Sequence, residues 1–213
     1  MRKALAVSII IISILLASNL YLLTSREEHT FTMNTIVKVY INDQLVYVKK
    51  GDMFNTNMEY FIRTIFDEGS YLIGMKNEDG ASVNFAGVNM DTRPYKDNIT
   101  EIRRIYAITD SGWSPTKTTV VLPDGSILLD AEYSYTVTEY SDNTIEITII
   151  KYKLFEDTAT IYGSALGSKL HYSDPTSGWK DDYFLFCVDK FDSAITVNAG
   201  DVLKIEYDIV INP

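Results

Sequence analysis

The sequence predicts an all-β protein, an antiparallel β-sandwich of jelly-roll type with one amphipathic helix, preceded by an N-terminal transmembrane helix. Short runs of β-branched and aromatic residues recur at near-even spacing, separated by turn-forming Gly, Pro, Asn and Asp residues. Several runs alternate apolar and polar residues, which is typical of antiparallel strands with one buried and one solvated face. A single apolar stripe of helical period and a single uncharged apolar run account for the two predicted helices.

The N-terminal segment is predicted to cross a membrane. Residues 5–23 carry no charge, and as a helix they would be about 28 Å long, enough to span the hydrocarbon core. Arg2 and Lys3 precede this run and Glu27 and Glu28 follow it, which favours export of the rest of the chain. We expect an uncleaved signal-anchor. A cleaved secretory signal and an archaeal prepilin-type signal cut after Lys3 are the two alternatives.

The chain is predicted to have three parts: residues 1–23 as the membrane segment, 24–34 as a polar linker, and 35–213 as one extracytoplasmic β-sandwich domain. The domain opens with the β-branched runs 35–41 and 45–48, which are joined by Asn, Asp and Gln. This pattern predicts a β-hairpin.

An amphipathic helix is predicted to follow the hairpin, because apolar residues from Phe54 to Phe66 recur at helical spacing. Asp52 or Asn55 is expected to cap its start, and Gly69 to end it. The helix is expected to close one end of a sheet, since its polar face lacks the basic residues of a membrane-surface helix. The apolar stripe consists of Phe54, Met58, Phe61, Ile62, Ile65 and Phe66.

The remainder of the domain is predicted to consist of strands and turns. Run 183–188 is apolar on both faces and is expected in the middle of a sheet. The predicted strands are 71–75, 82–88, 99–109, 118–122, 126–129, 132–140, 144–152, 159–165, 183–188, 195–197 and 202–211.

Charge and motif content exclude several classes of function. The chain has 19 basic and 29 acidic residues, a net charge of -10, and no basic cluster, so no nucleic-acid partner is expected. Cys187 lies in an apolar run and is predicted to be a core residue; His171 is expected on a surface turn, with no spacing that suggests zinc. Nucleophile-elbow, phosphate-loop and dinucleotide motifs are absent from the sequence.

The protein is therefore predicted not to be an enzyme and to bind no cofactor. A glycosidase needs only two carboxylates, and this is the one enzymatic alternative that the sequence leaves open. The many acidic residues could also recruit a divalent cation at the surface, although no calcium-loop motif is present.

Three loop residues are candidates for contact or modification. Trp113 and Trp179 each follow a Ser- and Gly-containing turn, where an aromatic side chain either contacts a sugar or another subunit or folds back to cap the sandwich. Asn98 begins the sequon Asn-Ile-Thr and is a glycosylation candidate in an exported protein.

Assembly with other copies is predicted to use strand edges. The segment Thr30–Tyr40 is polar and then β-branched, so it is a candidate to add a strand to a neighbouring copy. Thr35, Val37 and Val39 are the expected contact residues in that segment.

Two stretches carry a family resemblance. They are Val39–Tyr47, followed by Lys-Gly-Asp and the predicted helix, and the closing stretch Phe186–Val210, with a Gly-Asp turn before its last strand. Together they resemble the small β-rich tail-fibre-like or virion-surface structural proteins of head-tailed phages and of viruses or proviruses of thermophilic archaea. The resemblance implies a sandwich without catalytic residues. Such proteins usually lack an N-terminal membrane segment, so this chain is expected to be an anchored or filament-forming version.

The function expected from the sequence is that of a non-enzymatic structural protein. It would be a self-assembling subunit of an extracellular filament or virion surface, held at the membrane by residues 5–23 and partnered by copies of itself. A cell-surface adhesin or carbohydrate-binding module, recognising a glycan or host receptor, is one alternative. An archaeal pilin-like subunit cleaved after Lys3 is the other.

Overall fold

The computed structural model describes residues 32–51, 54–58, 76–77, 79–81, 101–141, 144–174 and 178–212. The chain divides into two compact units, and nearly all the described residues belong to the unit Met33–Asn212. The predicted membrane segment and most of the predicted linker lie outside the described residues. Among the residues that are described, no helix has the length and apolar character needed to cross a membrane.

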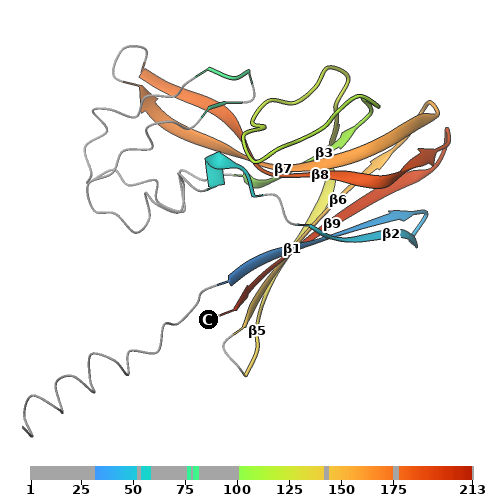
Figure 1. The fold of residues 1–213 in the computed structure, drawn as a ribbon, viewed down its shortest axis with the longest axis horizontal. Helices are drawn as coiled ribbons and strands as arrows, with labels where there is room; N and C mark the ends of the chain where they lie inside the picture. Colours follow the sequence, from blue (N-terminus) through green and yellow to red (C-terminus); the bar gives the residue numbers. More distant parts are fainter. Residues whose placement is uncertain are drawn as a thin grey trace, which may run out of the picture. The chain divides into compact units, whose positions relative to one another are not determined.

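Nine strands in the described ranges form two sheets (Figure 1). The five-stranded sheet has the order β2 (Gln44–Gly51), β1 (Thr32–Ile41), β9 (Val202–Asn212), β6 (Ile145–Leu154) and β5 (Ala131–Glu139). The four-stranded sheet has the order β4 (Ile127–Leu129), β3 (Glu101–Ile108), β7 (Ala159–Asp174) and β8 (Gly178–Val197). The prediction of a sandwich-like all-β fold with antiparallel sheets is confirmed.

The connectivity is built from local hairpins that alternate between the sheets. The pairs β1–β2 and β5–β6 lie in the five-stranded sheet, β3–β4 and β7–β8 lie in the four-stranded sheet, and β9 returns to the first between β1 and β6. This order of the described strands differs from the eight-strand, double Greek-key order of the jelly roll that the sequence predicted. Strand periodicity predicts the two faces of a strand and leaves its partners undetermined, so the order could not be derived from it.

The first hairpin follows the prediction closely. Ile41 pairs with Gln44, and the two residues between them, Asn42 and Asp43, have φ values of 49° and 62°. A two-residue loop with both φ values positive is the type I′ geometry, whose twist matches that of the flanking strands, and Asn and Asp tolerate it best after Gly. The strand begins at Thr32, so the end of the predicted linker already belongs to the sheet.

Other predicted elements are corrected. Residues 118–122 form a turn-containing loop in place of the expected strand. The backbones of His171 and Trp179 lie in strands, where His171 pairs with Asp181 and Trp179 with Ser173, because β7 and β8 form a much longer hairpin than expected. Polar residues near the tip of that hairpin suggested a loop, but partner strands satisfy their backbone groups. Of the predicted helix, residues 56–58 are helical, and its later residues lie outside the described ranges, as do 71–75 and 82–88.

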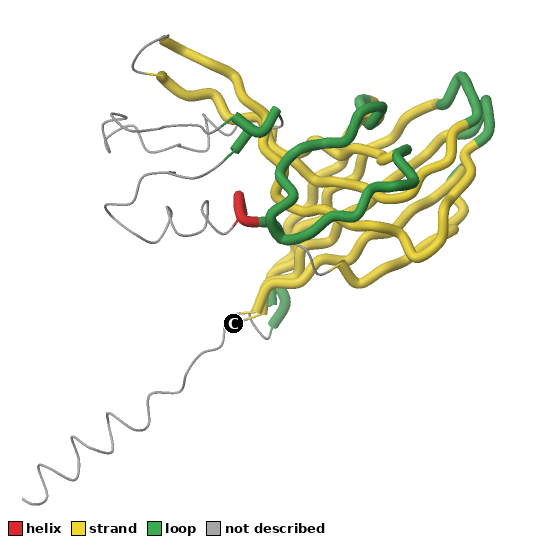
Figure 2. The backbone as a smooth tube through the Cα atoms, turned by 45° about the horizontal axis from the view of Figure 1, so that its top comes forward, coloured by secondary structure: helices red, strands yellow, loops and turns green. Residues whose placement is uncertain are grey.

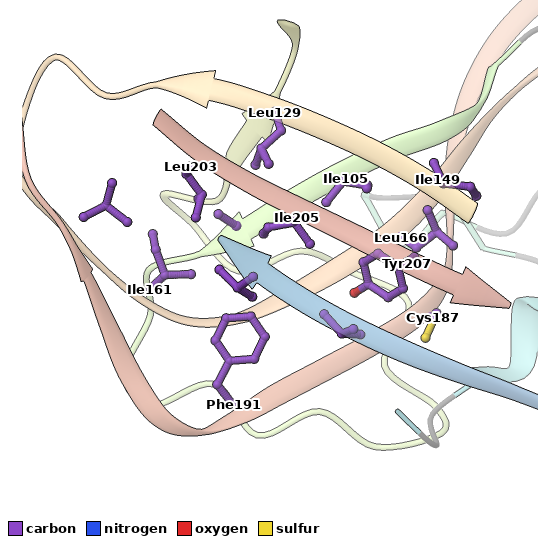
Figure 3. Packing of buried hydrophobic residues seen from close by; sticks show 14 of the residues in the cluster. Ile105, Leu129, Ile149, Ile161, Leu166, Cys187, Phe191, Leu203, Ile205 and Tyr207 are labelled. Atoms are coloured by element: carbon purple, nitrogen blue, oxygen red, sulfur yellow. The ribbon is translucent and has the colours of Figure 1, made fainter. Parts of the chain in front are cut away.

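The main core lies between the two sheets, as Figure 3 shows. Ile105 and Ala107 of β3 point into it, whereas Tyr106 and Ile108 belong to a second buried cluster on the opposite face of the four-stranded sheet. Loop 109–126 contributes Trp113 to that second cluster and crosses the strands in Figure 2. The four-stranded sheet is thus buried on both faces, which explains why its strands are apolar on both sides.

Candidate assembly surface

The segment predicted to donate a strand to a neighbouring copy is a strand of its own sheet. Thr35, Val37 and Val39 are all 0% exposed, and β1 lies between β2 and β9. The two valines belong to the main core. The expectation that these three residues contact another copy is therefore corrected: the alternation that made the segment a good strand also gave it a face that its own chain buries.

Trp113 also lies inside the chain. Its side chain is 7% exposed and packs in the second cluster, and no described residue accepts a hydrogen bond from its Nε1. The ring sits against Gly163, where an added Cβ would lie 2.6 Å from Trp113 Cζ3 and would clash with the backbone oxygen of Asp189. Of the two roles expected for Trp113, its position matches the one that caps the sheet. Asn98 lies outside the described residues, and Trp179 is described only by its backbone.

Replacing Gly163 with alanine is expected to lower the free energy of unfolding by about 2 kcal/mol, because the methyl group overpacks a site bounded by backbone. Gly112→Ala is the matched control; its Cβ would lie 3.3 Å from a carboxylate oxygen of Asp110, which can move. Chemical denaturation measures both. Equal stability of the Gly163 variant and the native chain would show that Trp113 is not packed against this glycine.

A buried polar cluster crosses the main core. Cys187 Sγ donates to Asp189 Oδ2 at 3.5 Å and lies 3.9 Å from Thr35 Oγ1, while the hydroxyls of Ser164 and Tyr207 are 2.6 Å apart. Burial raises the pKa of Tyr207 well above its ordinary value, and the neighbouring Asp189 and Cys187 groups raise it further. All five residues are at most 1% exposed. The cluster is therefore an internal link between the sheets, and the prediction of Cys187 as a core residue is confirmed.

The outer face of the five-stranded sheet is built around one lysine. Lys38 Nζ lies 2.7 Å from Glu206 Oε1 and 2.6 Å from Asp208 Oδ2, which joins β1 to β9. Thr148 of β6 donates to Asp208 Oδ1 at 2.8 Å, and the Tyr40 hydroxyl lies 3.4 Å from Glu206 Oε2. Asp208 is 1% exposed although it is on the outer face, so the lysine supplies the charge that its carboxylate needs.

The charge on Lys38 is stabilised by this arrangement. Partial burial would lower the pKa of Lys38, but hydrogen bonds and charge interactions with Asp208 and Glu206 outweigh burial and raise the pKa above its ordinary value of 10.5. The lysine therefore remains protonated at neutral pH, and the outer face is a satisfied polar surface where β1 meets β9.

One edge of the four-stranded sheet, β8, is covered by a short segment of the same chain. Phe54 forms an isolated bridge with Cys187, and the Asn55 backbone N–H donates to Phe186 O at 3.0 Å. The side-chain amides of Asn55 and Asn57 both donate to the Leu185 carbonyl, at 2.9 and 3.2 Å. The prediction that 183–188 lies in the middle of a sheet is thus corrected: among the described strands, β8 is an edge strand whose edge is capped by asparagines.

The opposite edge of the same sheet is β4, which has only three residues. Short strands and covered edges are two ways in which proteins prevent edge-to-edge pairing. Both edges of the four-stranded sheet are protected in this way.

The five-stranded sheet has edges of a different character. In the described part of the chain, β2 pairs only with β1 and β5 only with β6. Most of the exposed large apolar side chains of the described residues are in or beside these two strands: Leu45, Val46, Val48, Val137 and Tyr140, each 46–53% exposed. An exposed edge strand with apolar side chains is a site where another chain can add a strand.

A β-bulge shapes the β2 edge. Val39 pairs with Tyr47 and Tyr40 with Leu45, so Val46 is an extra residue in β2. Leu45 and Val48 face Tyr40 and Lys38, which lie on the same side of β1, so the bulge brings both exposed apolar residues to the outer face. Neither Leu45 nor Val48 was predicted to be exposed. The available signal was a run of apolar residues at 45, 46 and 48 that breaks the period of two.

Within the described ranges, no group of three or more His, Cys, Asp or Glu side chains is arranged to hold a metal ion. Comparison of the chain with protein-family models, curated proteins and solved structures finds no match.

Proposed function

We propose that this protein is a non-enzymatic structural subunit that assembles with copies of itself on an extracellular filament or virion surface. The observation that carries the proposal is the contrast between the two sheets. The edges of the four-stranded sheet are short or covered, whereas both edges of the five-stranded sheet expose large apolar side chains. Edge protection is the usual arrangement in a protein that stays monomeric, so two edges that no described residue covers favour assembly.

The sequence supports the extracellular and membrane-anchored parts of the proposal. The uncharged run 5–23, with positive charges before it and negative charges after it, favours an exported domain on an anchor. The resemblance to tail-fibre-like and virion-surface proteins favours a structural role. A pilin-like subunit cleaved after Lys3 is the form of this proposal in which the apolar helix enters a filament core.

The proposal of an adhesin is less well supported. It relied on Trp113 and Trp179 as exposed stacking residues, and Trp113 is buried against Gly163. A carbohydrate ligand needs an aromatic face open to solvent, so the adhesin proposal would depend on Trp179 alone.

Electron microscopy of the native full-length protein tests the proposed function. Protein recovered from the membrane or the medium of producing cells would be examined by negative stain, and the mature N-terminus would be read by mass spectrometry from the same sample. Filaments or particles are the expected result, with Met1 indicating an anchored form and Ala4 a pilin-like form. Isolated monomers in both fractions would contradict the proposal.

A further inference from the structure

We infer that the β2 edge is a self-pairing interface: β2 of one copy pairs antiparallel with β2 of a second copy around a two-fold axis. This inference rests on the proposed function and names the strand and the symmetry that assembly uses. The occupant of the edge is therefore a second copy of this chain.

The charges along β2 favour this pairing. Asp43 precedes the strand and Lys50 lies near its end, and both are exposed. Antiparallel pairing brings the acidic start of one strand to the basic end of the other, so Asp43 faces Lys50 of the partner subunit, whereas parallel pairing would put like charges side by side. Asp43 already lies 3.1 Å from Lys204 Nζ, but its side chain is 85% exposed and can accept a second cation.

The apolar residues fit the same register. When Asp43 faces the opposite Lys50, Leu45 faces the opposite Val48. These residues are 53% and 52% exposed and lie on one face because of the bulge. The two-fold axis therefore forms this one Leu45–Val48 contact twice, which is the self-complementarity that a two-fold interface requires.

The pairing also completes the backbone of β2. Its outer N–H and C=O groups would join a ladder to the second copy, extending the five-stranded sheet across the interface. The outer face remains polar through Lys38, Glu206 and Asp208, so the extended sheet would stay solvated on that side.

Disulfide trapping in the full-length chain tests the inference. Val46 lies next to the two-fold axis in this register, so Val46→Cys is expected to form a disulfide-linked dimer on mild oxidation in membranes of producing cells. The native cysteine, Cys187, is 0% exposed and should not react. Leu154→Cys and Thr138→Cys are the controls, because both residues are exposed and lie away from β2.

A charge variant checks that β2 itself is responsible. Adding Val48→Lys to Val46→Cys places two extra positive charges in the interface and is expected to reduce trapping at least about tenfold. Leu154→Lys in the same background is the matched control, which adds a lysine at an apolar position that is 59% exposed. Its trapping should equal that of Val46→Cys alone.

The outcomes separate this inference from the proposed function. No dimer from Val46→Cys, or trapping that Val48→Lys leaves unchanged, would overturn β2 self-pairing even if microscopy shows filaments. A disulfide-linked dimer that forms only when Val46→Cys and Thr138→Cys chains are mixed would overturn β2 self-pairing in favour of contact between β2 and β5. Efficient Val46→Cys trapping without any filament or particle would support β2 pairing and contradict the proposed function.

Discussion

Replacing Lys38 with alanine is expected to lower the free energy of unfolding by about 3 kcal/mol, because it leaves a carboxylate on β9 without its cation. Asp208 is 1% exposed and accepts its charge-assisted hydrogen bond from Lys38 at 2.6 Å, and Glu206 loses the same partner. Urea denaturation at neutral pH measures the loss. The variant is also expected to unfold from the β1–β9 region first, which hydrogen exchange would detect.

Lys153→Ala is the control for this change. Lys153 lies 3.1 Å from Asp130, but the Asp130 side chain is 62% exposed, and an exposed pair contributes less than about 1 kcal/mol. If Lys38→Ala and Lys153→Ala lower the free energy of unfolding by the same amount, the interpretation of Lys38 as the counter-charge of a buried carboxylate is wrong.

The contribution of Lys38 should also depend on pH in a definite direction. Its pKa is raised in the folded state, so folding favours the protonated lysine. The stability from this group is complete below the ordinary lysine value of 10.5 and is lost as the pH rises through the folded-state pKa. The difference between the native chain and Lys38→Ala should therefore be constant near neutral pH and shrink in alkali.

Replacing Asn55 with aspartate is expected to lower the free energy of unfolding by about 3 kcal/mol, because it turns a buried hydrogen-bond donor into a buried charge. Asn55 Nδ2 donates to Thr119 O and Leu185 O, both at 2.9 Å, and the residue is 2% exposed. An aspartate oxygen in that place would face two carbonyl oxygens. The other oxygen could still accept from the backbone N–H groups of Asn57 and Met58, as Asn55 Oδ1 does.

Thermal unfolding as a function of pH checks this expectation. Burial and the two carbonyls would raise the pKa of the new carboxyl, so the penalty should grow as the pH rises above about 4. Gln44→Glu adds the same charge on an exposed residue of β2 and should change stability by less than about 0.5 kcal/mol. A pH-independent loss in Asn55→Asp would indicate that the carboxylate escapes to solvent.

The contrast between these two sites shows what local sequence can predict. Lys38 alternates with Val37 and Val39, and Glu206 and Asp208 alternate with Ile205 and Tyr207, so the outward direction of all three charges follows from period two. Their contact depends on β1 lying beside β9, strands separated by most of the domain. The site was therefore predictable as two polar faces and not as one cluster.

Asn55 illustrates a second limit of prediction from local sequence. The sequence offered Asp52 or Asn55 as the helix cap, and Asn55 Oδ1 does accept from the backbone N–H groups of Asn57 and Met58. Its side-chain amide, however, also donates to carbonyls of β8 and of the loop at Thr119. No local sequence pattern predicts these two hydrogen bonds. The same holds for Trp113 in loop 109–126, whose burial depends on the absence of a side chain at Gly163 of β7.

The sequence by itself determined the all-β class, the first hairpin with its Asn- and Asp-containing turn, and the core position of Cys187, because these depend on residue propensities and alternation along one segment. Only the tertiary structure decided the strand order, the burial of Thr35 and Trp113, the coverage of the β8 edge, and the exposure of the β2 edge. Those features arise from pairing between distant segments, and a strand's sequence specifies its two faces but not its neighbours.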